Sequence, residues 1–288
     1  MNFRIICIQE MIGLYKRKWI EQIAERNKAS FLQWQQLHLP SAKNESFYTV
    51  VSFSGGKWFA DQLYSLYSFY RNVGKPQQWL IYNDGTYTIT QLDALRKIDR
   101  VTVCDLDLSD ARLPKEALQK FPTLKKVEIV AKHTSDEKTI IADSDILFYR
   151  HFSSLIKSDS KINNYLVDEG SRYFDKDFLM EHPSIDQPFN FGLLLLHSPF
   201  SMESVYTYLE ERYRTGMLDY WSDQTAFQML VMNDTDFEAL DRELFKVGGS
   251  DSFHLSHCVD YDEIALRHFV GPVRHKMWQF SWKKVLDV

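Results

Sequence analysis

Two aspartates, Asp143 and Asp145, interrupt an otherwise apolar run, KTIIADSDILFY, at residues 138–149. In an extended strand, residues i and i+2 point to the same side, so the spacing predicts two adjacent carboxylates where the strand leaves its sheet. Burying such a pair alone costs several kcal/mol, because each charge loses hydration and repels the other. A Mg²⁺ or Mn²⁺ ion offsets this cost, and it fills its remaining positions with phosphate and water oxygens. The pair therefore predicts a metal site for a diphosphate ligand; the alternative is a solvated turn at a strand end.

The residues around the pair predict alternating strands and helices. Apolar, β-branched runs predict strands at 47–55, 78–85, 100–106 and 138–149. Apolar residues three and four apart predict a helix from Phe59 to Val73, and shorter helical stretches follow at 91–98 and 114–130. This alternation indicates an α/β fold with a mostly parallel sheet covered on both faces. Such sheets bind ligands at the carboxyl ends of their strands, which is where the aspartates fall.

The second half of the chain is less regular. Strands are predicted in NNYLVDEG (163–170) and NFGLLLLHSP (190–199), and helices from Ser201 to Gly216 and from Ser222 to Asn233. Asp168 and Glu169, in LVDEG, are interpreted as turn residues. Asp84, at the end of a strand in YNDG, is a candidate for binding a nucleotide base or ribose, although NDG is equally a turn signature.

Composition limits the classes of function. The chain has 288 residues, 44% of them hydrophobic, with 20 Phe, 15 Tyr and 7 Trp, which indicates an aromatic-rich globular protein. Its formal net charge of −5 argues against a nucleic-acid surface, because binding a phosphate backbone requires a basic face. Cys7, Cys104 and Cys258 are widely separated and lack metal-ligand spacing, so a reducing, cytoplasmic environment is expected.

The N-terminal segment, residues 1–45, is predicted to be a helical extension. Through Trp34 it carries six basic and three acidic residues in a helix-compatible pattern. This pattern fits either a helix docked on the domain or peripheral contact with an anionic membrane surface. No stretch approaches the roughly 18 to 20 apolar residues that a membrane-spanning helix needs.

Several motifs together resemble one enzyme family. TIIADSDILFY resembles the Asp-x-Asp strand of GT-A glycosyltransferases, and further motifs resemble the metal-dependent, retaining branch that includes glycogenin and bacterial lipopolysaccharide galactosyltransferases. FNFGLLLLHSP is similar to that branch's Asn-x-Gly strand, with Asn190 and Gly192, and WSDQTAFQML resembles its Asp-Gln helix start, with Asp223 and Gln224. These matches are loose individually and specific in their shared order.

HFVGPVRHKMW resembles the family's C-terminal His-x-x-Gly-x-x-Lys-Pro-Trp element, with His268 and Gly271 in place. The chain departs from the pattern beyond these two residues. Arg274 takes the place of the lysine, Lys276 and Trp278 come two places late, and Met277 stands where proline would be. The basic residue 17 positions before the first aspartate, usually arginine, is Lys126 here. Arginine and lysine present different donor geometries, so the diphosphate contacts differ in detail from the family's.

The resemblance implies a set of site residues. Asp143, Asp145 and His268 would hold Mn²⁺ or Mg²⁺, and Asp143 would also contact the donor ribose. The donor sugar would face the catalytic candidates Asn190, Asp223 and Gln224. The nucleotide and diphosphate would be bound by Asp84, Lys126, Gly271, Arg274 and Lys276.

The resemblance also implies a fold and an activity. We expect a Rossmann-like GT-A domain at 46–288, with a nucleotide-binding half at 46–150 and a second half at 151–288 that binds the acceptor and carries the C-terminal metal and diphosphate element. The expected activity is transfer of a sugar from a nucleotide-sugar donor, a UDP-sugar, with retention, to a saccharide, lipid-linked or protein acceptor. Two alternatives stay open: a sugar nucleotidyltransferase, whose Gly-rich basic loop is only faintly matched by SFSGGKWF, and a catalytically silent carbohydrate-binding or scaffold protein of the same fold.

Overall fold

The centre of the protein is a seven-stranded sheet with the strand order β3-β2-β1-β4-β7-β6-β8. The computed structural model describes residues 3–136, 138–151, 161–248, 263–279 and 281–288. The strands of this sheet are β1 (Thr49–Ser54), β2 (Gln78–Asn83), β3 (Val101–Asp105), β4 (Thr139–Ala142), β6 (Asn163–Val167), β7 (Phe189–Leu196) and β8 (Phe237–Ala239). Neighbouring strands are parallel except where β7 pairs with β4 and β6. The predicted α/β fold with a mostly parallel sheet is confirmed.

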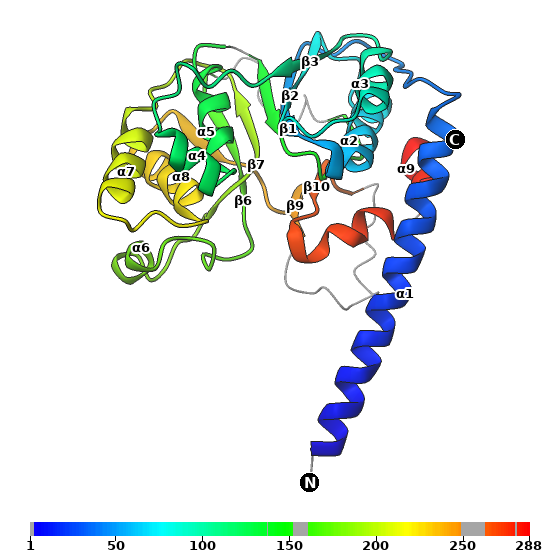
Figure 1. The fold of residues 1–288 in the computed structure, drawn as a ribbon, viewed down its shortest axis with the longest axis horizontal. Helices are drawn as coiled ribbons and strands as arrows, with labels where there is room; N and C mark the ends of the chain where they lie inside the picture. The colour runs from blue at the N-terminus through cyan, green and yellow to red at the C-terminus, as the bar shows by residue number, and fades with distance from the viewer. Residues whose placement is uncertain (1–2, 137, 152–160, 249–262, 280) are drawn as a thin grey trace.

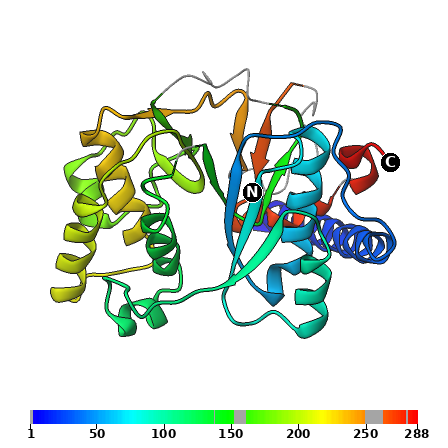
Figure 2. The same ribbon diagram turned by 90° about the horizontal axis from the view of Figure 1, so that it is seen from above.

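Helices cover both faces of this sheet (Figures 1 and 2). One face packs on α2 (Phe59–Asn72) and α3 (Ile89–Arg96), with α9 (Trp282–Leu286) packed on α2, and the other on α4 (Lys115–Lys120), α5 (Leu124–Ala131), α7 (Glu203–Arg214) and α8 (Ser222–Asn233). Within β1, Val50 belongs to the first apolar core and Val51 to the second. Because both faces are buried, the central strands are continuous apolar runs rather than alternating ones.

A second sheet of three strands, with the order β5-β10-β9, corrects the prediction of a single strand at 138–149. Its strands are β5 (Ile146–Phe148), β9 (Phe245–Val247) and β10 (Leu266–His268). The chain leaves the large sheet after Ala142 and enters the small one at Ile146, so the two aspartates lie in the connection. Residues 143–145 are polar and form a turn between the two sheets, and they belong to neither strand.

The predicted helical stretch at 114–130 is also divided, into α4 and α5. Phe121 ends α4 with φ −124° and ψ 84°, outside the helical region. Pro122 follows it, and a proline forces the preceding residue toward extended conformations. A short helix, α6 (Lys176–Glu181), joins β6 to β7 and was not predicted, whereas α8 matches the predicted helix from Ser222 to Asn233.

The N-terminal helix α1 (Phe3–Gln35) runs along one side of the molecule, beside the 3₁₀ segment η2 (Gly271–Trp278) and α9 (Figure 1). Its buried residues Ile20, Ala24 and Phe31 face the domain. The part of α1 that carries these three residues is therefore docked on the domain, which was one of the two interpretations of its sequence pattern. No helix in the described part of the chain is long and apolar enough to cross a membrane.

Candidate active site

A cavity of about 550 Å³ lies where the strand order of the large sheet reverses. β2 and β3 lie on one side of β1 and β4 on the other, so the segments after β1 and β4 diverge and leave a crevice at the carboxyl edge. Ser54, the last residue of β1, and Asp143, just after β4, both line it. Because β7 runs antiparallel to β4, its first residues reach the same edge, where the backbone N–H of Asp143 donates to Gly192 O at 2.9 Å.

Pairing of the small sheet brings a histidine to the two aspartates. β10 is antiparallel to β5, with His268 opposite Ile146, and the Phe269 N–H donates to Asp145 O at 2.8 Å. One carboxylate oxygen each from Asp143 and Asp145 and a ring nitrogen of His268 lie within 4.8 Å of one another. His268 Nε2 is 3.2 Å from Asp145 Oδ1 and 3.6 Å from Asp143 Oδ2. Two carboxylate oxygens and one imidazole nitrogen are donors that suit Mn²⁺.

Asn190 fixes the orientation of the histidine ring. Its Oδ1 accepts from the Gly192 N–H at 2.9 Å and lies 2.8 Å from His268 Nδ1, while its Nδ2 donates to Asp168 Oδ2 at 2.7 Å. These partners assign the amide oxygen to the histidine side, so Nδ1 carries the proton and donates it. Nε2 then either holds a second proton between the two carboxylates or gives its lone pair to a cation bound with them.

Gly192 provides the space that this ring occupies. A Cβ atom added there would lie 2.1 Å from His268 Nδ1 and 2.3 Å from Cε1, well inside contact distance. Any residue other than glycine would therefore displace the ring. This is the physical reason for the Asn-x-Gly pattern in β7: the asparagine orients the histidine, and the glycine makes room for it.

Asp145 has the features expected of a metal ligand. It is 1% exposed, and no donor in the described residues makes a hydrogen bond to its Oδ1. Burial alone would raise the pKa of Asp145, but His268 and Arg274 outweigh burial and hold the pKa below its usual range. The residue is therefore an anion in the interior, with one oxygen turned toward His268. The donor set fits a divalent cation.

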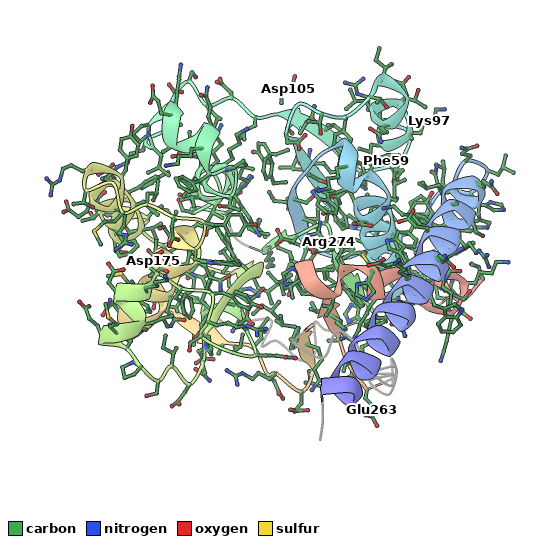
Figure 3. All side chains as sticks on the ribbon, turned by 60° about the horizontal axis from the view of Figure 1, so that its bottom comes forward. Phe59, Lys97, Asp105, Asp175, Glu263 and Arg274 are labelled. Atoms are coloured by element: carbon green, nitrogen blue, oxygen red, sulfur yellow. The ribbon has the colours of Figure 1, made fainter. Side chains whose placement is uncertain are left out.

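Two basic side chains contact the aspartates directly. Lys126, on α5, pairs with Asp143 and also donates to Phe191 O. Arg274, on η2, pairs with Asp145 and lies over the Trp58 ring, 3.7 Å from its centroid. Both line the cavity, and Figure 3 shows Arg274 on η2 between the central strands and α1. Cationic groups therefore already balance the two carboxylates.

Asp223 and Gln224 lie in the first turn of α8 and line the same cavity. Asp223 is buried, and burial raises its pKa to about 6. Its Oδ1 accepts from the Gln224 N–H at 2.8 Å, and Gln224 Nε2 donates to Tyr173 O at 3.4 Å. The Asp-Gln pair thus presents a carboxyl and an amide to the space next to the metal-ligand cluster.

The other predicted nucleotide and diphosphate ligands divide into two groups. Asp84, Gly271 and Arg274 line the cavity. Asp84 is exposed and accepts from the Thr86 N–H at 2.9 Å, and a Cβ atom at Gly55 would lie within 2.2 Å of its carboxylate. Lys276 is 5% exposed and is not among the cavity-lining residues, so the structure does not bring it to the other candidates.

Comparisons with known proteins identify the fold. No protein-family model matches the sequence, and no curated protein does. Among solved structures, the galactosyltransferase LgtC, in complex with donor and acceptor sugar analogues, matches with a TM-score of 0.58 and 13% identity over 83% of this chain and 95% of that one. Mouse xyloside xylosyltransferase 1 matches with a TM-score of 0.56 and 16% identity over 79% and 99%. GlyE from Streptococcus pneumoniae TIGR4 matches with a TM-score of 0.52 and 14% identity over 83% and 63%.

The chain has the GT-A glycosyltransferase fold. The resemblance stated from the sequence motifs is thereby confirmed at the level of the fold. Within this GT-A fold, Asp143 and Asp145 lie in the connection between the two sheets and His268 ends β10 of the small sheet, 125 positions after the first aspartate.

The sequence interpretation missed some cavity residues. Asp168 was interpreted as a turn residue, but it is 4% exposed, accepts from Asn190 and lines the cavity. The LVDEG pattern resembles a turn because the strand ends there; a buried run directly before an Asp was the available signal. The aromatic lining was missed as well, since no spacing distinguishes these residues from core aromatics: Trp58, Tyr173, Tyr220 and Trp221.

Proposed function

We propose that the protein is a metal-dependent glycosyltransferase that takes a sugar from a UDP-sugar donor, using Mn²⁺ or Mg²⁺. The observation that carries the proposal is the convergence of Asp143, Asp145 and His268 inside a cavity at the reversal point of a GT-A sheet. The solved structures with this fold are named as glycosyltransferases, and one of them holds donor and acceptor sugar analogues.

In the proposed mechanism, the chain's residues bind and orient the leaving nucleoside diphosphate. A cation held by Asp143, Asp145 and His268 would supply Lewis-acid stabilisation of the charge that develops on the diphosphate. Arg274 and Lys126 line the same cavity and would exchange part of their pairing with the aspartates for the phosphate oxygens. The carboxylates would stay neutralised after this exchange, because a divalent cation would then balance their charge.

The donor sugar is proposed to lie against the first turn of α8. Asp223 and Gln224 offer a carboxyl and an amide that can hydrogen-bond sugar hydroxyls there. Asn190 lines the same wall, but its amide is bonded to His268, Gly192 and Asp168, so we assign it to positioning the histidine. Asp84, which also lines the cavity, would bind the base or ribose. Transfer with retention is part of the proposal and is supported by the family resemblance of these motifs.

One observation favours a second candidate, a catalytically silent binding protein of the same fold. Lys126 pairs with Asp143 and Arg274 with Asp145, so two side-chain cations can balance the two carboxylates in place of a metal ion. A protein that had lost its metal would keep this arrangement and would bind a saccharide without a metal requirement. The two candidates therefore differ in a measurable property.

The proposed reaction would take place in the cytoplasm, since three dispersed cysteines fit a reducing compartment. The acceptor would be a saccharide, a lipid-linked molecule or a protein. In the lipid-linked case, α1 would contact the membrane surface peripherally.

A panel of UDP-sugars tests the proposal. UDP release is measured with Mn²⁺ and with a chelator, with and without pooled saccharide acceptors, for the wild type and for Asp145→Ala. The proposal expects metal-dependent UDP release from at least one donor by the wild type and none by the variant at equal folded content. Normal release by Asp145→Ala would overturn the metal-site assignment, and release from no donor would favour the silent candidate.

A further inference from the structure

The segment that carries Gly271 and Arg274 into the cavity is η2, an eight-residue 3₁₀ helix. Helices of this type have poorer hydrogen-bond geometry than α-helices, and runs longer than about four residues are uncommon. The internal hydrogen bonds of η2 are therefore a weak restraint. The place of Arg274 depends on the elements that pack against η2.

The N-terminal helix α1 packs along η2 (Figures 1 and 3). Two residues of α1 contact Trp278, the last residue of η2. Asn27 Nδ2 donates to Trp278 O at 2.8 Å. One turn further along α1, the Phe31 ring lies 5.5 Å from the Trp278 ring, centroid to centroid. Phe31 is fully buried and Trp278 is 3% exposed, so this contact lies in the apolar core.

A buried carboxylate holds the same tryptophan from the other side. Asp61, in the first turn of α2, accepts from Trp278 Nε1 at 2.7 Å. It is 2% exposed, and its charged neighbours include Lys28 of α1, whose Nζ is 3.8 Å away, and Arg274 of η2. A buried carboxylate without partners is strongly unfavourable, which fixes the indole where its N–H is needed. Trp278 is thus held at its carbonyl by α1 and at its indole by α2.

These contacts are connected to the cavity through η2. Arg274 lies four residues before Trp278, and its guanidinium occupies a narrow place between Asp145 and the Trp58 ring. A shift of η2 would move Arg274 out of that place and would move Gly271 at the cavity wall. Asn27, Phe31 and Asp61 do not line the 550 Å³ cavity, whereas Gly271 and Arg274 of η2 do, so η2 connects these three residues to the cavity.

We propose that α1 and the first turn of α2 support the donor site: Asn27 and Phe31 of α1 and Asp61 of α2 are positioning residues that keep η2 docked and thereby set the affinity for a nucleoside diphosphate. This inference rests on the proposed function, because the ligand it names is the leaving diphosphate of that reaction. It gives the N-terminal extension a role that its sequence pattern did not reveal.

Two variants of the full chain test the docking step. Asn27→Ala removes the donor to Trp278 O, and Tyr67→Phe is the matched control, because it removes a similar hydrogen bond from α2 to His38 O (2.6 Å) beyond the end of α1. Hydrogen exchange at residues 271–278 is followed by mass spectrometry without ligand. We expect about fivefold faster exchange in Asn27→Ala, the factor for losing one hydrogen bond, and wild-type exchange in Tyr67→Phe. Unchanged exchange in Asn27→Ala overturns the proposal.

The affinity step is tested by titrating the same proteins with UDP and Mn²⁺. We expect the Kd for UDP to rise about threefold or more in Asn27→Ala, because only the docked fraction of η2 binds, and to stay at the wild-type value in Tyr67→Phe. Faster exchange with an unchanged Kd overturns the link between α1 and the donor site. If the wild type binds no UDP, the proposed function fails and the affinity claim fails with it, while the exchange data still decide whether α1 holds η2.

A conservative pair at Asp61 separates hydrogen bonding from bulk packing. Asp61→Asn keeps an oxygen that accepts from the indole N–H, whereas Asp61→Leu removes it. The proposal expects near-wild-type exchange at 271–278 and a near-wild-type Kd in Asp61→Asn, and both effects of Asn27→Ala in Asp61→Leu. Equal behaviour of the two variants contradicts it.

Discussion

Replacing Gly192 by alanine should weaken the metal site without replacing any of its proposed ligand residues. The new methyl group would lie 2.1 Å from His268 Nδ1, whereas ordinary contact begins at 3.4 Å, so the ring must move by about 1.3 Å. It would also press on Asn190 Oδ1 at 2.8 Å, the atom that holds the ring. His268 Nε2 now lies 3.2 Å from Asp145 Oδ1, and a shift of this size takes it out of reach of a shared cation.

The expected magnitude follows from these distances. Loss of an orienting contact typically costs 10- to 100-fold in metal affinity, so we expect the Kd for Mn²⁺ to rise by about 100-fold when ligand and orienting contact are both displaced. The overpacking itself should lower the free energy of unfolding by about 1–3 kcal/mol.

Mn²⁺ affinity is measured by calorimetry, and folded content by thermal unfolding with and without Mn²⁺. Gly170→Ala is the matched control, because a Cβ atom at that position meets nothing within 4 Å. Mn²⁺ affinity within twofold of the wild type in a folded Gly192→Ala protein would refute the assignment of His268 as a ligand.

Three further predictions concern single side chains. Asn190→Ala removes the acceptor of His268 Nδ1, so calorimetry should show about 10- to 100-fold weaker Mn²⁺ binding, and unchanged binding would contradict the positioning role. Arg274→Ala leaves Asp145 without its guanidinium partner, so Mn²⁺ alone should raise the unfolding temperature more than in the wild type while UDP binding weakens about tenfold; wild-type UDP affinity would count against a phosphate contact. Burial raises the pKa of Asp223 to about 6, so its stabilising contribution is fully present below about pH 4 and is lost as the pH rises through 6. Urea unfolding should show that the free energy of unfolding of the wild type is lower at pH 7 than at pH 4, with about 3 kcal/mol of the decrease absent in Asp223→Asn. An equal decrease in the two proteins would refute the contribution of Asp223.

Local sequence patterns predicted the elements of the first half of the chain well. β-branched apolar runs and residues spaced three and four apart reflect packing against an apolar core, and they located β1, α2, β2 and β3 within a few residues. The separation of β4 from β5 at residues 143–145 was not predicted, because the apolar residues on both sides together have the pattern of one strand. Only long-range pairing, of β4 with β1 and of β5 with β10, shows that they belong to different sheets.

The site was predicted in part for a similar reason. Asp143, Asp145 and His268 were assigned from their residue types and order, and the structure brings their ligand atoms together. Local patterns do not show which way a side chain points from an irregular segment. Lys276 was therefore expected near the phosphates, although it is buried away from the cavity, and Asp168 was assigned to a turn, although it supports Asn190.

The N-terminal helix shows the same limit. Its charge pattern fitted either docking or a membrane surface, and only the tertiary contacts of Asn27 and Phe31 with Trp278 show where this half of the helix packs.

Calorimetric titration of UDP into the wild-type protein, with Mn²⁺ and with a chelator, tests the central claim most directly, with GDP as the control nucleotide and Asp145→Asn as the control protein. The account predicts UDP binding that requires Mn²⁺, is weaker for GDP and is lost in Asp145→Asn. Binding of UDP that is equally tight in the chelator, or no binding of either nucleotide with Mn²⁺, would contradict it.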